Sequence, residues 1–367
     1  MRHNILGLVS CNYTNDAFGN LTAARPVASI PFGGRYRLLD FILSNMVNAG
    51  MRTIGIITPY YYRSILDHVG AGKEWSLNRK SGGMFILPGS IYGLKNARGM
   101  FLLRDIIGNR SYLDRSTADH VLLSGSNKIF NMDLLPFFEA HRASGGGITL
   151  LYKHINDATA KEGLFLQQDG GAVTAIRQEA VGAADLFMDC LLIDRKLLLN
   201  FIDWYQTIGY IDIMDIITEN LDSLQVGAYG FDGYLGSIDS VSDYMNCSMD
   251  LLRDDVRREL FYGEGKIYTK VQDTAPAKYA EGSRVLNSLV PTGCIIEGTV
   301  ENSILFRGVT VGKGAVIKNS VIMQKCEIGP GVVLENVICD KLVKISSEHK
   351  LFGRAGKPLV LAKQSEI

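Results

Sequence analysis

Cysteine is scarce in this sequence, and no two cysteines have the C-x-x-C spacing that zinc and redox sites use. Disulfides persist mainly in oxidising compartments, so a few scattered cysteines in a long chain are typical of reduced intracellular proteins. We therefore expect free thiols, a cytoplasmic location and no metal bound by cysteine. The six are Cys11, Cys190, Cys247, Cys294, Cys326 and Cys339.

Long apolar runs and an excess of charge of either sign are also absent. No stretch of about 18 apolar residues occurs, so the sequence predicts no membrane-spanning helix. The 38 basic residues equal the 38 acidic ones, whereas a nucleic-acid-binding protein usually has a basic excess. The apolar run at residues 5–9 is short and lacks a small-residue cleavage site, which favours a buried strand over a signal peptide. We therefore expect neither a nucleic-acid nor a membrane partner.

The apolar sequence that is present is enough for two domains. With 367 residues, 47% of them hydrophobic, the chain is too long for one small core. Short apolar runs alternate with helical patterns, and the runs lie at residues 5–9, 54–58 and 121–123. The clearest helical pattern places apolar residues on one face from Leu38 to Ala49 and stops at Gly50. Strand, helix and strand in this order predict an α/β fold over residues 1–250, with a Rossmann-like, doubly wound mixed sheet.

From about residue 286 the sequence repeats with a period of 17. The repeats begin at Asn302, Asn319 and Asn336. A fixed period with recurrent apolar and glycine positions indicates stacked coils that bury one another's apolar faces. The pattern resembles the hexapeptide left-handed parallel β-helix, and a β-sandwich with regular turns is the alternative. We assign residues 286–367 to this domain and residues 251–285 to a linker.

Several ordered motifs extend along nearly the whole chain. They lie at residues 31–41, 43–45, 68–70, 82–88, 228–234 and 303–309, and the first reads PFGGRYRLLDF. In this order they resemble the ADP-glucose pyrophosphorylase (glucose-1-phosphate adenylyltransferase) family. The resemblance implies a nucleotidyltransferase domain joined to a carboxyl-terminal β-helix. It also implies an activity that makes ADP-glucose and pyrophosphate from ATP and glucose 1-phosphate, for glycogen or starch synthesis.

The sequence departs from that family at positions to which the resemblance assigns chemistry. The loop after the first strand, residues 9–22, lacks the paired glycines and the arginine that hold a triphosphate. Ser126 and Ser237 stand where two metal-binding aspartates are expected, although a shift of two residues would place Asp239 at the second position. The lysines expected near the substrates are replaced by Val27, Glu179 and Met214.

These losses predict a catalytically degenerate chain. Metal assistance is worth several kcal/mol of transition-state stabilisation, and about 1.4 kcal/mol is tenfold in rate. We therefore expect this chain to have no catalytic residue and to bind no metal or cofactor. The resemblance implies a regulatory and structural subunit in a heterotetramer, in which the catalytic partner holds the Mg²⁺. For that contact we expect exposed apolar coil edges at residues 304–306 and 332–334.

Two other functions remain open. An active transferase with relocated metal ligands would use Asp105, Asp232 or Asp239. An acyltransferase of the β-helix type would need a histidine between coils, but the sequence has none between His154 and His349.

Arginines suited to a phosphorylated effector are retained. By the resemblance, Arg25 and Arg37 match positions near the family's effector site, with Arg35 between them in the same region. Guanidinium groups suit the geometry of phosphate oxygens. The family's lysine just before Arg25 is Ala24 here, and Arg37 would alternatively cap a helix or pair with an acid.

Overall fold

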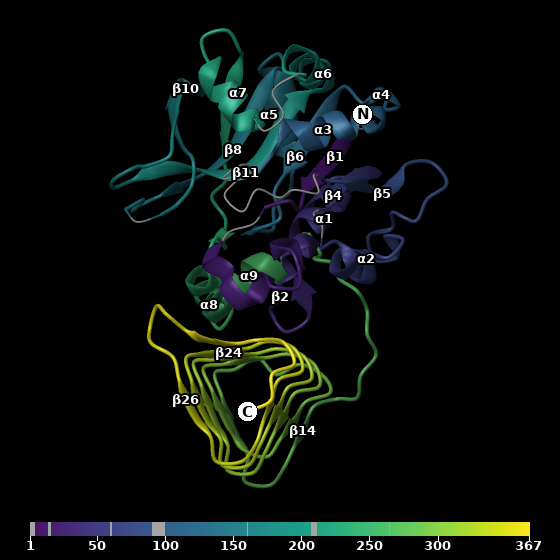
Figure 1. Ribbon diagram of the computed structural model, residues 1–367. Coiled ribbons are helices and arrows are strands. Elements are labelled where there is room, and N and C mark those ends of the chain that lie inside the picture. Colours follow the sequence, from purple (N-terminus) through teal and green to yellow (C-terminus); the bar gives the residue numbers. More distant parts are fainter. Residues whose placement is uncertain are drawn as a thin grey trace.

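A nine-stranded mixed sheet lies at the centre of the amino-terminal domain, with the strand order β5-β4-β1-β6-β11-β8-β12-β10-β9 (Figure 1). The structure is a computed structural model that describes residues 4–13, 16–58, 61–89, 100–159, 161–206, 211–263 and 265–367. β5, β4, β1 and β6 run parallel, and β11 is antiparallel to both β6 and β8. The strands of this sheet are β1 Ile5–Ser10, β4 Thr53–Thr58, β5 Gly83–Pro88, β6 His120–Ser124, β8 Ile148–Ile155, β9 Phe165–Asp169, β10 Ala172–Arg177, β11 Ala184–Asp194 and β12 Val226–Gly230.

The predicted strands coincide with β1, β4 and β6, and the predicted helix with α1 (Leu38–Asn48). α1 begins where the Asp40 carboxylate accepts the backbone N–H of Arg37, at 2.9 Å. It ends before Gly50, whose φ of 82° suits the left-handed turn after a helix. The sequence-based α/β prediction is therefore confirmed.

Helices cover both faces of the sheet. One apolar cluster joins the strands to α3, α6 and α7, and another joins them to α1, α2 and α5. This two-sided burial explains why β1 consists entirely of buried residues. The remaining helices are α2 Arg63–Val69, α3 Leu103–Gly108, α4 Arg110–Asp114, α5 Leu135–Ala143, α6 Arg195–Trp204, α7 Ile213–Glu219, α8 Val241–Asp250 and α9 Asp254–Phe261, with short 3₁₀ turns η1 Asp16–Thr22, η2 Val27–Ser29 and η3 Lys73–Trp75.

The carboxyl-terminal domain is a parallel β-helix, seen nearly end-on in Figure 1. Its three sheets have the orders β14-β16-β19-β22-β25, β15-β17-β20-β23-β26 and β18-β21-β24-β27. Val300, Ile317, Leu334 and Leu351 pair in register from coil to coil, which confirms the period of 17. Antiparallel pairing, which a β-sandwich requires, is absent from these three sheets in the described residues.

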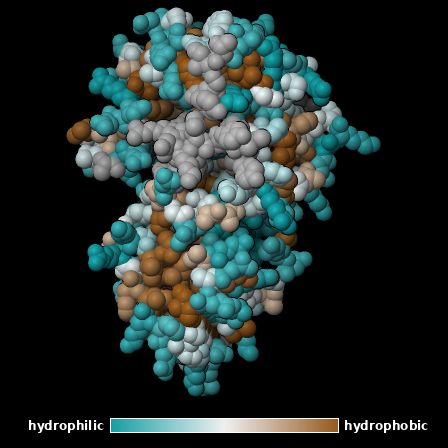
Figure 2. Space-filling model, in the orientation of Figure 1, coloured by the Kyte–Doolittle hydropathy of each residue, from teal (hydrophilic) through white to brown (hydrophobic). Residues whose placement is uncertain are grey.

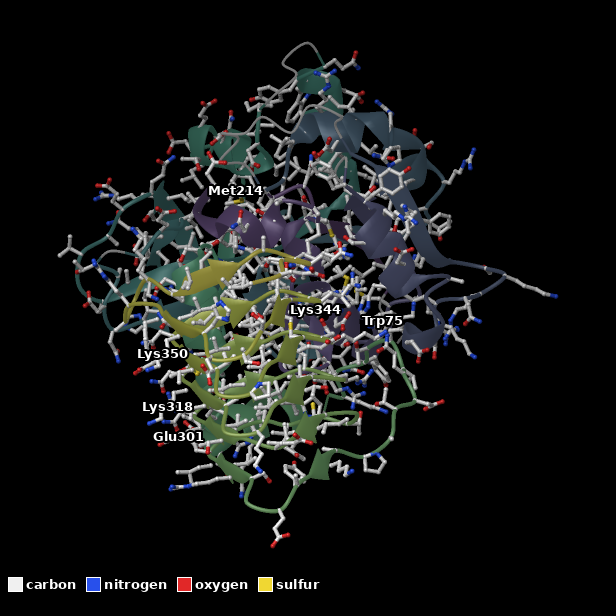
Figure 3. The ribbon with its side chains drawn as sticks, turned by 60° about the horizontal axis from the view of Figure 1, so that its bottom comes forward. Trp75, Met214, Glu301, Lys318, Lys344 and Lys350 are labelled. Atoms are coloured by element: carbon white, nitrogen blue, oxygen red, sulfur yellow. The ribbon has the colours of Figure 1, made fainter. Side chains whose placement is uncertain are left out.

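Repeated side chains hold the coils in register. The Ser303 hydroxyl accepts the backbone N–H of Ser320, and the Ser320 hydroxyl accepts that of Val337, both at 3.1 Å. On the outside, Glu301 and Lys318 lie 3.6 Å apart in neighbouring coils, and Figure 3 labels both on one side of the stack. These coils have β14 Lys278–Tyr279, β15 Arg284–Leu286, β16 Ile295–Ile296, β17 Thr299–Glu301, β18 Ile304–Leu305, β19 Thr310–Val311, β20 Val316–Lys318, β21 Val321–Ile322, β22 Glu327–Ile328, β23 Val333–Glu335, β24 Val337–Cys339, β25 Lys344–Ile345, β26 Lys350–Phe352 and β27 Leu359–Leu361.

The segment assigned to a linker, residues 251–285, contains more structure than the sequence pattern indicated. α9 packs Val256 and Leu260 into a core shared with the β-helix, and β14 already belongs to the first coil. The stretch between them, 266–277, contains no helix or strand.

The apolar residues expected at exposed coil edges are instead mostly inside the protein. Ile304, Leu305 and Phe306 are fully buried, as are Val332 and Leu334. The expectation was wrong because three-sided coils turn these side chains inward, onto the next coil or the other domain.

Other apolar side chains of the β-helix are exposed, and Figure 2 shows apolar residues gathered over this domain on the face in view. The exposed ones are Tyr279, Leu286, Ile295, Leu342 and Phe352.

The two domains share an apolar core. Phe32 and Phe41 of the first domain lie in one cluster with Phe306 and Met323 of the second. A buried ion pair between Arg25 and Asp340 crosses the same junction. The β-helix is therefore fixed to the sheet domain by packing as well as by charge.

All six cysteines lie in the described part of the chain, and each is free and buried, as expected. Among the described residues, none of the helices combines the length and apolarity that crossing a bilayer would require.

Candidate functional site

The carboxyl end of β6 is the place where parallel sheets of this kind hold ligands. Ser126 lies there, two residues after the strand, and is buried. Its hydroxyl donates to the carbonyl oxygen of Ser10, at the carboxyl end of β1, over 3.3 Å. The position thus offers a hydrogen bond within the protein, where a carboxylate would offer a metal two charged oxygens.

A buried lysine fills the centre of this site. Lys128 begins the short strand β7 (Lys128–Ile129), which pairs with β13 (Gly236–Ser237). Its ammonium nitrogen lies 2.5 Å from the Ser237 hydroxyl, 3.0 Å from Asp239 Oδ2 and 3.3 Å from Asp189 Oδ2. Only 5% of the lysine side chain is exposed. One ammonium group therefore gathers two carboxylates and a hydroxyl from three separate elements.

Further hydrogen bonds occupy the same Asp239 carboxylate. Its Oδ1 accepts from the Asn127 amide at 2.7 Å and from the Tyr13 hydroxyl at 3.1 Å. Its Oδ2 also accepts from the Ser237 hydroxyl at 2.6 Å. The two residues proposed for the second metal position, Ser237 and Asp239, thus lie together, but both are directed at Lys128.

The pKa directions agree with this geometry. Burial by itself would raise the pKa of Asp239, but Lys128 and the Ser237 hydroxyl outweigh it and hold that pKa below its ordinary value. Burial disfavours the charged form of Lys128, yet Asp239 and Asp189 raise the pKa of the ammonium. Burial raises the pKa of Asp189, which Lys128 only partly opposes. Lys128 is therefore a permanent cation at physiological pH.

The loop after β1 is packed rather than open to a triphosphate. In η1, Phe18 and Leu21 are fully buried, and the turn packs against α8 and β27. Cys11 is buried beside Ser126, and burial raises the pKa of its thiol to about 12. Residues 14 and 15 of this loop lie outside the described residues.

The three predicted lysine replacements do not meet at the site. Val27 is buried in the core shared by the two domains, and Met214 is buried in α7 on one face of the sheet (Figure 3). Glu179 is exposed after β10.

The alternative metal ligands are also engaged elsewhere. Asp105 Oδ2 accepts from the Asn12 amide at 2.5 Å. The Asp232 carbonyl accepts from Lys153, which draws the Asp232 backbone to the edge of β8. Asp105 lines a small cavity with Ser10 and Leu123 at the same edge of the sheet, whereas Asp239 faces Lys128.

The predicted effector arginines take three different roles. Arg25 is buried, donates to the carbonyl oxygen of Leu21 at 2.9 Å and pairs with Asp340 of the β-helix. Arg37 donates to the carbonyl oxygen of Ser64, while its backbone N–H is capped by Asp40. Arg35 is exposed, and its guanidinium lies 5.2 Å from the centre of the Tyr36 ring.

Positive charge nevertheless gathers at the domain junction. Burial lowers the pKa of Arg37 to about 10, with Arg25 contributing in the same direction against Asp40. Burial, then Arg37 and Arg25, lower the pKa of Lys341 to about 7. Within the described residues Lys341 forms no ion pair, so an anion between these three cations would relieve their mutual repulsion.

Sequence reasoning missed Lys128, Asp189 and Lys341. Lys128 had a signal: a lysine is unusual between the end of a buried strand and the apolar pair Ile129-Phe130. Asp189 and Lys341 had none, because only the antiparallel entry of β11 and the docking of the β-helix bring them into place.

Comparisons with known proteins agree with both domains. Residues 18–177 match the nucleotidyl transferase family, and residues 274–353 match the GlmU-like C-terminal hexapeptide family, whose fold is the left-handed β-helix. The chain is 39% identical to the glycogen biosynthesis protein GlgD of Bacillus subtilis, over 98% of this chain and 96% of that protein. It is 38% identical to GlgD of Geobacillus stearothermophilus (86% and 84%) and 31% identical to a glucose-1-phosphate adenylyltransferase of Clostridium botulinum (86% and 83%). The chain therefore belongs to the family of the glucose-1-phosphate adenylyltransferases, together with the GlgD proteins.

Proposed function

We propose that this chain is a catalytically silent subunit of a glucose-1-phosphate adenylyltransferase in glycogen biosynthesis. Its partner would be a catalytic chain of the same family, which holds the Mg²⁺ and makes ADP-glucose from ATP and glucose 1-phosphate. The kinship with GlgD and with glucose-1-phosphate adenylyltransferases supports the pathway. The subunit's role is to stabilise the partner and to tune its response to effectors.

The Lys128 ion pairs are the observation that carries the proposal. The ammonium lies within 3.3 Å of both Asp189 and Asp239, so it neutralises the carboxylates available to a divalent cation. At an effective dielectric constant of about 20, placing Mg²⁺ roughly 3 Å from an ammonium group costs about 10 kcal/mol of repulsion. That repulsion cancels about as much attraction as one carboxylate supplies at the same distance, so Lys128 makes the site much poorer for the metal on which the chemistry depends.

The cationic junction supports a regulatory role. Arg25, Arg37 and Lys341 lie where the two domains meet, and a phosphorylated effector bound there would change how the β-helix is held. The exposed apolar side chains of the β-helix are the surface we propose for the catalytic partner, as a hetero-oligomer in which related chains make pseudo-symmetric contacts.

Co-expression with a catalytic homologue tests this proposal. Pyrophosphate release from ATP and glucose 1-phosphate is measured for this chain alone, for the homologue alone and for the co-purified pair. We expect no release by this chain alone, and a pair whose substrate or effector curves differ from those of the homologue. A pair with unchanged curves contradicts the regulatory role.

The same assay distinguishes the alternative of an active transferase with relocated ligands. That function requires Mg²⁺-dependent release by this chain alone, and loss of the activity in Asp239→Asn. Glu301→Gln is the matched control, because Glu301 is an acid of the β-helix exterior remote from the cleft. Mg²⁺-dependent release that Asp239→Asn leaves unchanged would point to a contaminating enzyme rather than to this chain.

A further inference from the structure

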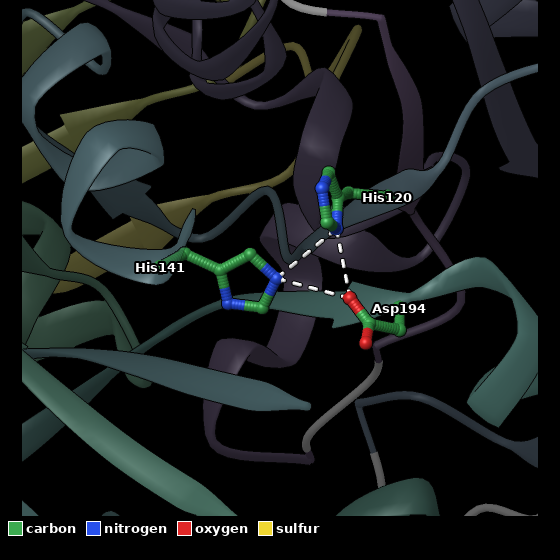
Figure 4. Close-up of side chains that lie close together, drawn as sticks. All are labelled: His120, His141 and Asp194. Carbon is green, nitrogen blue, oxygen red and sulfur yellow. Dashed lines mark hydrogen bonds and ion pairs between the residues drawn. The ribbon is translucent and has the colours of Figure 1, made fainter. Parts of the chain in front are cut away.

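Two histidines and an aspartate converge at the opposite end of β6 from the cleft. His120 begins β6, Asp194 ends β11, and the two residues pair directly across these antiparallel strands. His141 reaches them from α5. Figure 4 shows the two imidazole rings and the carboxylate turned toward one common point. The strand between His120 and Ser126 spans about 20 Å, so this cluster is separate from the Lys128 site.

The three facing atoms form a nearly regular triangle. His120 Nδ1 lies 2.8 Å from Asp194 Oδ1 and 3.2 Å from His141 Nε2, and the third side, from His141 Nε2 to Asp194 Oδ1, is 3.4 Å. Zinc lies about 2.0–2.1 Å from imidazole nitrogen, and tetrahedral geometry then separates two ligand atoms by about 3.3 Å. Two sides of the triangle match one face of such a tetrahedron, and the third, the 2.8 Å contact of His120 with Asp194, would lengthen by about 0.5 Å around an ion.

Neighbouring groups hold each ligand in this orientation. His141 Nδ1 lies 2.8 Å from the Thr149 hydroxyl, which directs Nε2 of the same ring at His120. The backbone N–H of Gly147 donates to Asp194 Oδ2 at 2.9 Å and leaves Oδ1 facing the histidines. Such outer contacts fix the orientation of ligands in protein metal sites.

Burial and exposure suit a bound ion with an open position. The His141 side chain is 1% exposed, so its ring is held inside the domain with Nε2 directed at the other two groups. His120 and Asp194 keep 21% and 34% of their side chains exposed, which leaves a path for an ion and a water ligand. In the part of the chain that the structure describes, this is the one histidine and acid group with such convergence.

We propose that His120, His141 and Asp194 form a binding site for one divalent transition-metal ion of the zinc class, with solvent as the remaining ligand. Two imidazoles and one carboxylate favour zinc, cobalt or nickel over Mg²⁺ or Ca²⁺, which prefer oxygen ligands alone. The ion joins β6, β11 and α5, so its role is to stabilise the amino-terminal domain. The sequence-based expectation of no metal rested on Ser126, Ser237 and the cysteine spacing; these three ligands are separated by 21 and 53 residues and follow no motif (141 − 120 and 194 − 141).

Metal binding by the purified full-length chain tests the proposal. After removal of bound metal with a chelator, zinc is titrated by calorimetry and metal content is measured by mass spectrometry. We expect one zinc per chain, no measurable uptake of Mg²⁺ or Ca²⁺, and a cobalt derivative with the visible absorption of a site that has nitrogen ligands. Absence of stoichiometric zinc binding overturns the proposal. The three side chains would then be held together by their hydrogen bonds alone.

Variants locate the site. His120→Asn removes a partly exposed ligand and is expected to weaken zinc binding at least about 100-fold, while Thr149→Val, which only releases His141, weakens it about 10–100-fold. His154→Asn is the matched control. His154 also pairs with an aspartate, Asp185 at 2.7 Å, but the second imidazole of the proposed site is missing there. Unchanged zinc affinity in both His120→Asn and Thr149→Val overturns the assignment. If His120→Asn fails to fold, Thr149→Val alone decides. None of these outcomes depends on catalytic activity, so the proposal stands or fails independently of the silent-subunit function.

Discussion

Lys128 places a cation of the chain itself between two carboxylates. Its ammonium nitrogen contacts Asp189, Asp239 and Ser237, so the carboxylates stay compensated without metal. Ser126 adds no carboxylate to this site, and its hydroxyl donates to the carbonyl oxygen of Ser10. In the silent subunit that we propose, the ammonium would take the place of a metal ion between these carboxylates.

Replacing Lys128 by methionine tests whether its ammonium group compensates the two carboxylates. Lys128→Met leaves two carboxylates in a largely buried site without their cation, and we expect a loss of about 3–5 kcal/mol in the free energy of unfolding. Urea denaturation at pH 7 measures it. We also expect Mg²⁺, which the histidine cluster should not bind, to raise the melting temperature of Lys128→Met but not of the unaltered chain.

Lys344→Met is the control for this change. Lys344 is 54% exposed and lies 3.6 Å from Glu327, so its removal should change stability by no more than about 0.5 kcal/mol. Equal losses in the two variants would show that Lys128 does not compensate buried charge.

Lys341 gives the cationic junction a pH dependence. Its pKa of about 7 lies below that of a lysine in an unfolded chain, so the folded protein loses this proton first as the pH rises. The charged groups that act on it are Arg37, Arg25, Asp340 and Lys363. A bound anion favours the protonated form, so we expect sulfate to raise the melting temperature more at pH 6 than at pH 8. Sulfate is the appropriate probe because it does not itself titrate in this range.

The variant Lys341→Met should remove most of this difference between the two pH values. Lys318→Met, which alters an exposed lysine of the β-helix exterior, should keep it. A sulfate effect that is the same at both pH values in the unaltered chain would contradict a role for Lys341 in anion binding.

At the scale of elements, glycines determine how closely the coils stack. A Cβ on Gly312 would lie 2.8 Å from the backbone nitrogen of Pro330 and 2.9 Å from the carbonyl carbon of Gly329, both in the next coil. Gly312→Ala is therefore expected to destabilise the protein by about 2–3 kcal/mol, because backbone cannot move aside as a side chain can. Chemical denaturation followed by circular dichroism measures the change.

Gly108→Ala supplies the comparison. Gly108 ends α3, and no atom lies within 4 Å of the place that a Cβ would take there, so alanine should be neutral or stabilising by up to about 1 kcal/mol. If Gly312→Ala is tolerated equally well, then close stacking at that glycine does not limit the coil spacing.

Elements with local signals were predictable from sequence, and those set by tertiary contacts were not. The strands β1, β4 and β6, helix α1 and the period of 17 each follow from apolar spacing within a few residues. The start of the β-helix at β14 was not predictable from the period, because the asparagine of the first coil, Asn287, stands 15 residues before Asn302 rather than 17, and the coil is recognised by its pairing with the next one. The Lys128 site likewise depends on β11, which enters the sheet antiparallel from far along the chain.

At the scale of the whole molecule, the junction joins the sheet domain to the β-helix through a shared apolar core and a buried ion pair. Arg25 and Asp340 form an ion pair with both side chains almost fully buried, 7% and 2% exposed, and the shared apolar core surrounds it. An anion at the neighbouring cations would act on the same contact. The regulatory role that we propose requires a joint of this kind, because an effector can change only those equilibria that its binding site takes part in.

Breaking the ion pair should therefore loosen the joint before it unfolds either domain. Arg25→Met leaves the Asp340 carboxylate buried without a partner, and we expect a loss of about 3–5 kcal/mol in stability. The combination with Asp340→Leu should recover part of that loss, since no unpaired charge remains. Arg253→Met, which breaks an exposed pair with Asp255, should leave the stability unchanged. Limited proteolysis checks the location: residues 270–276 are exposed and link the domains, so Arg25→Met should be cleaved there faster than the double variant. Equal cleavage rates in the two would mean that the ion pair does not hold the domains together.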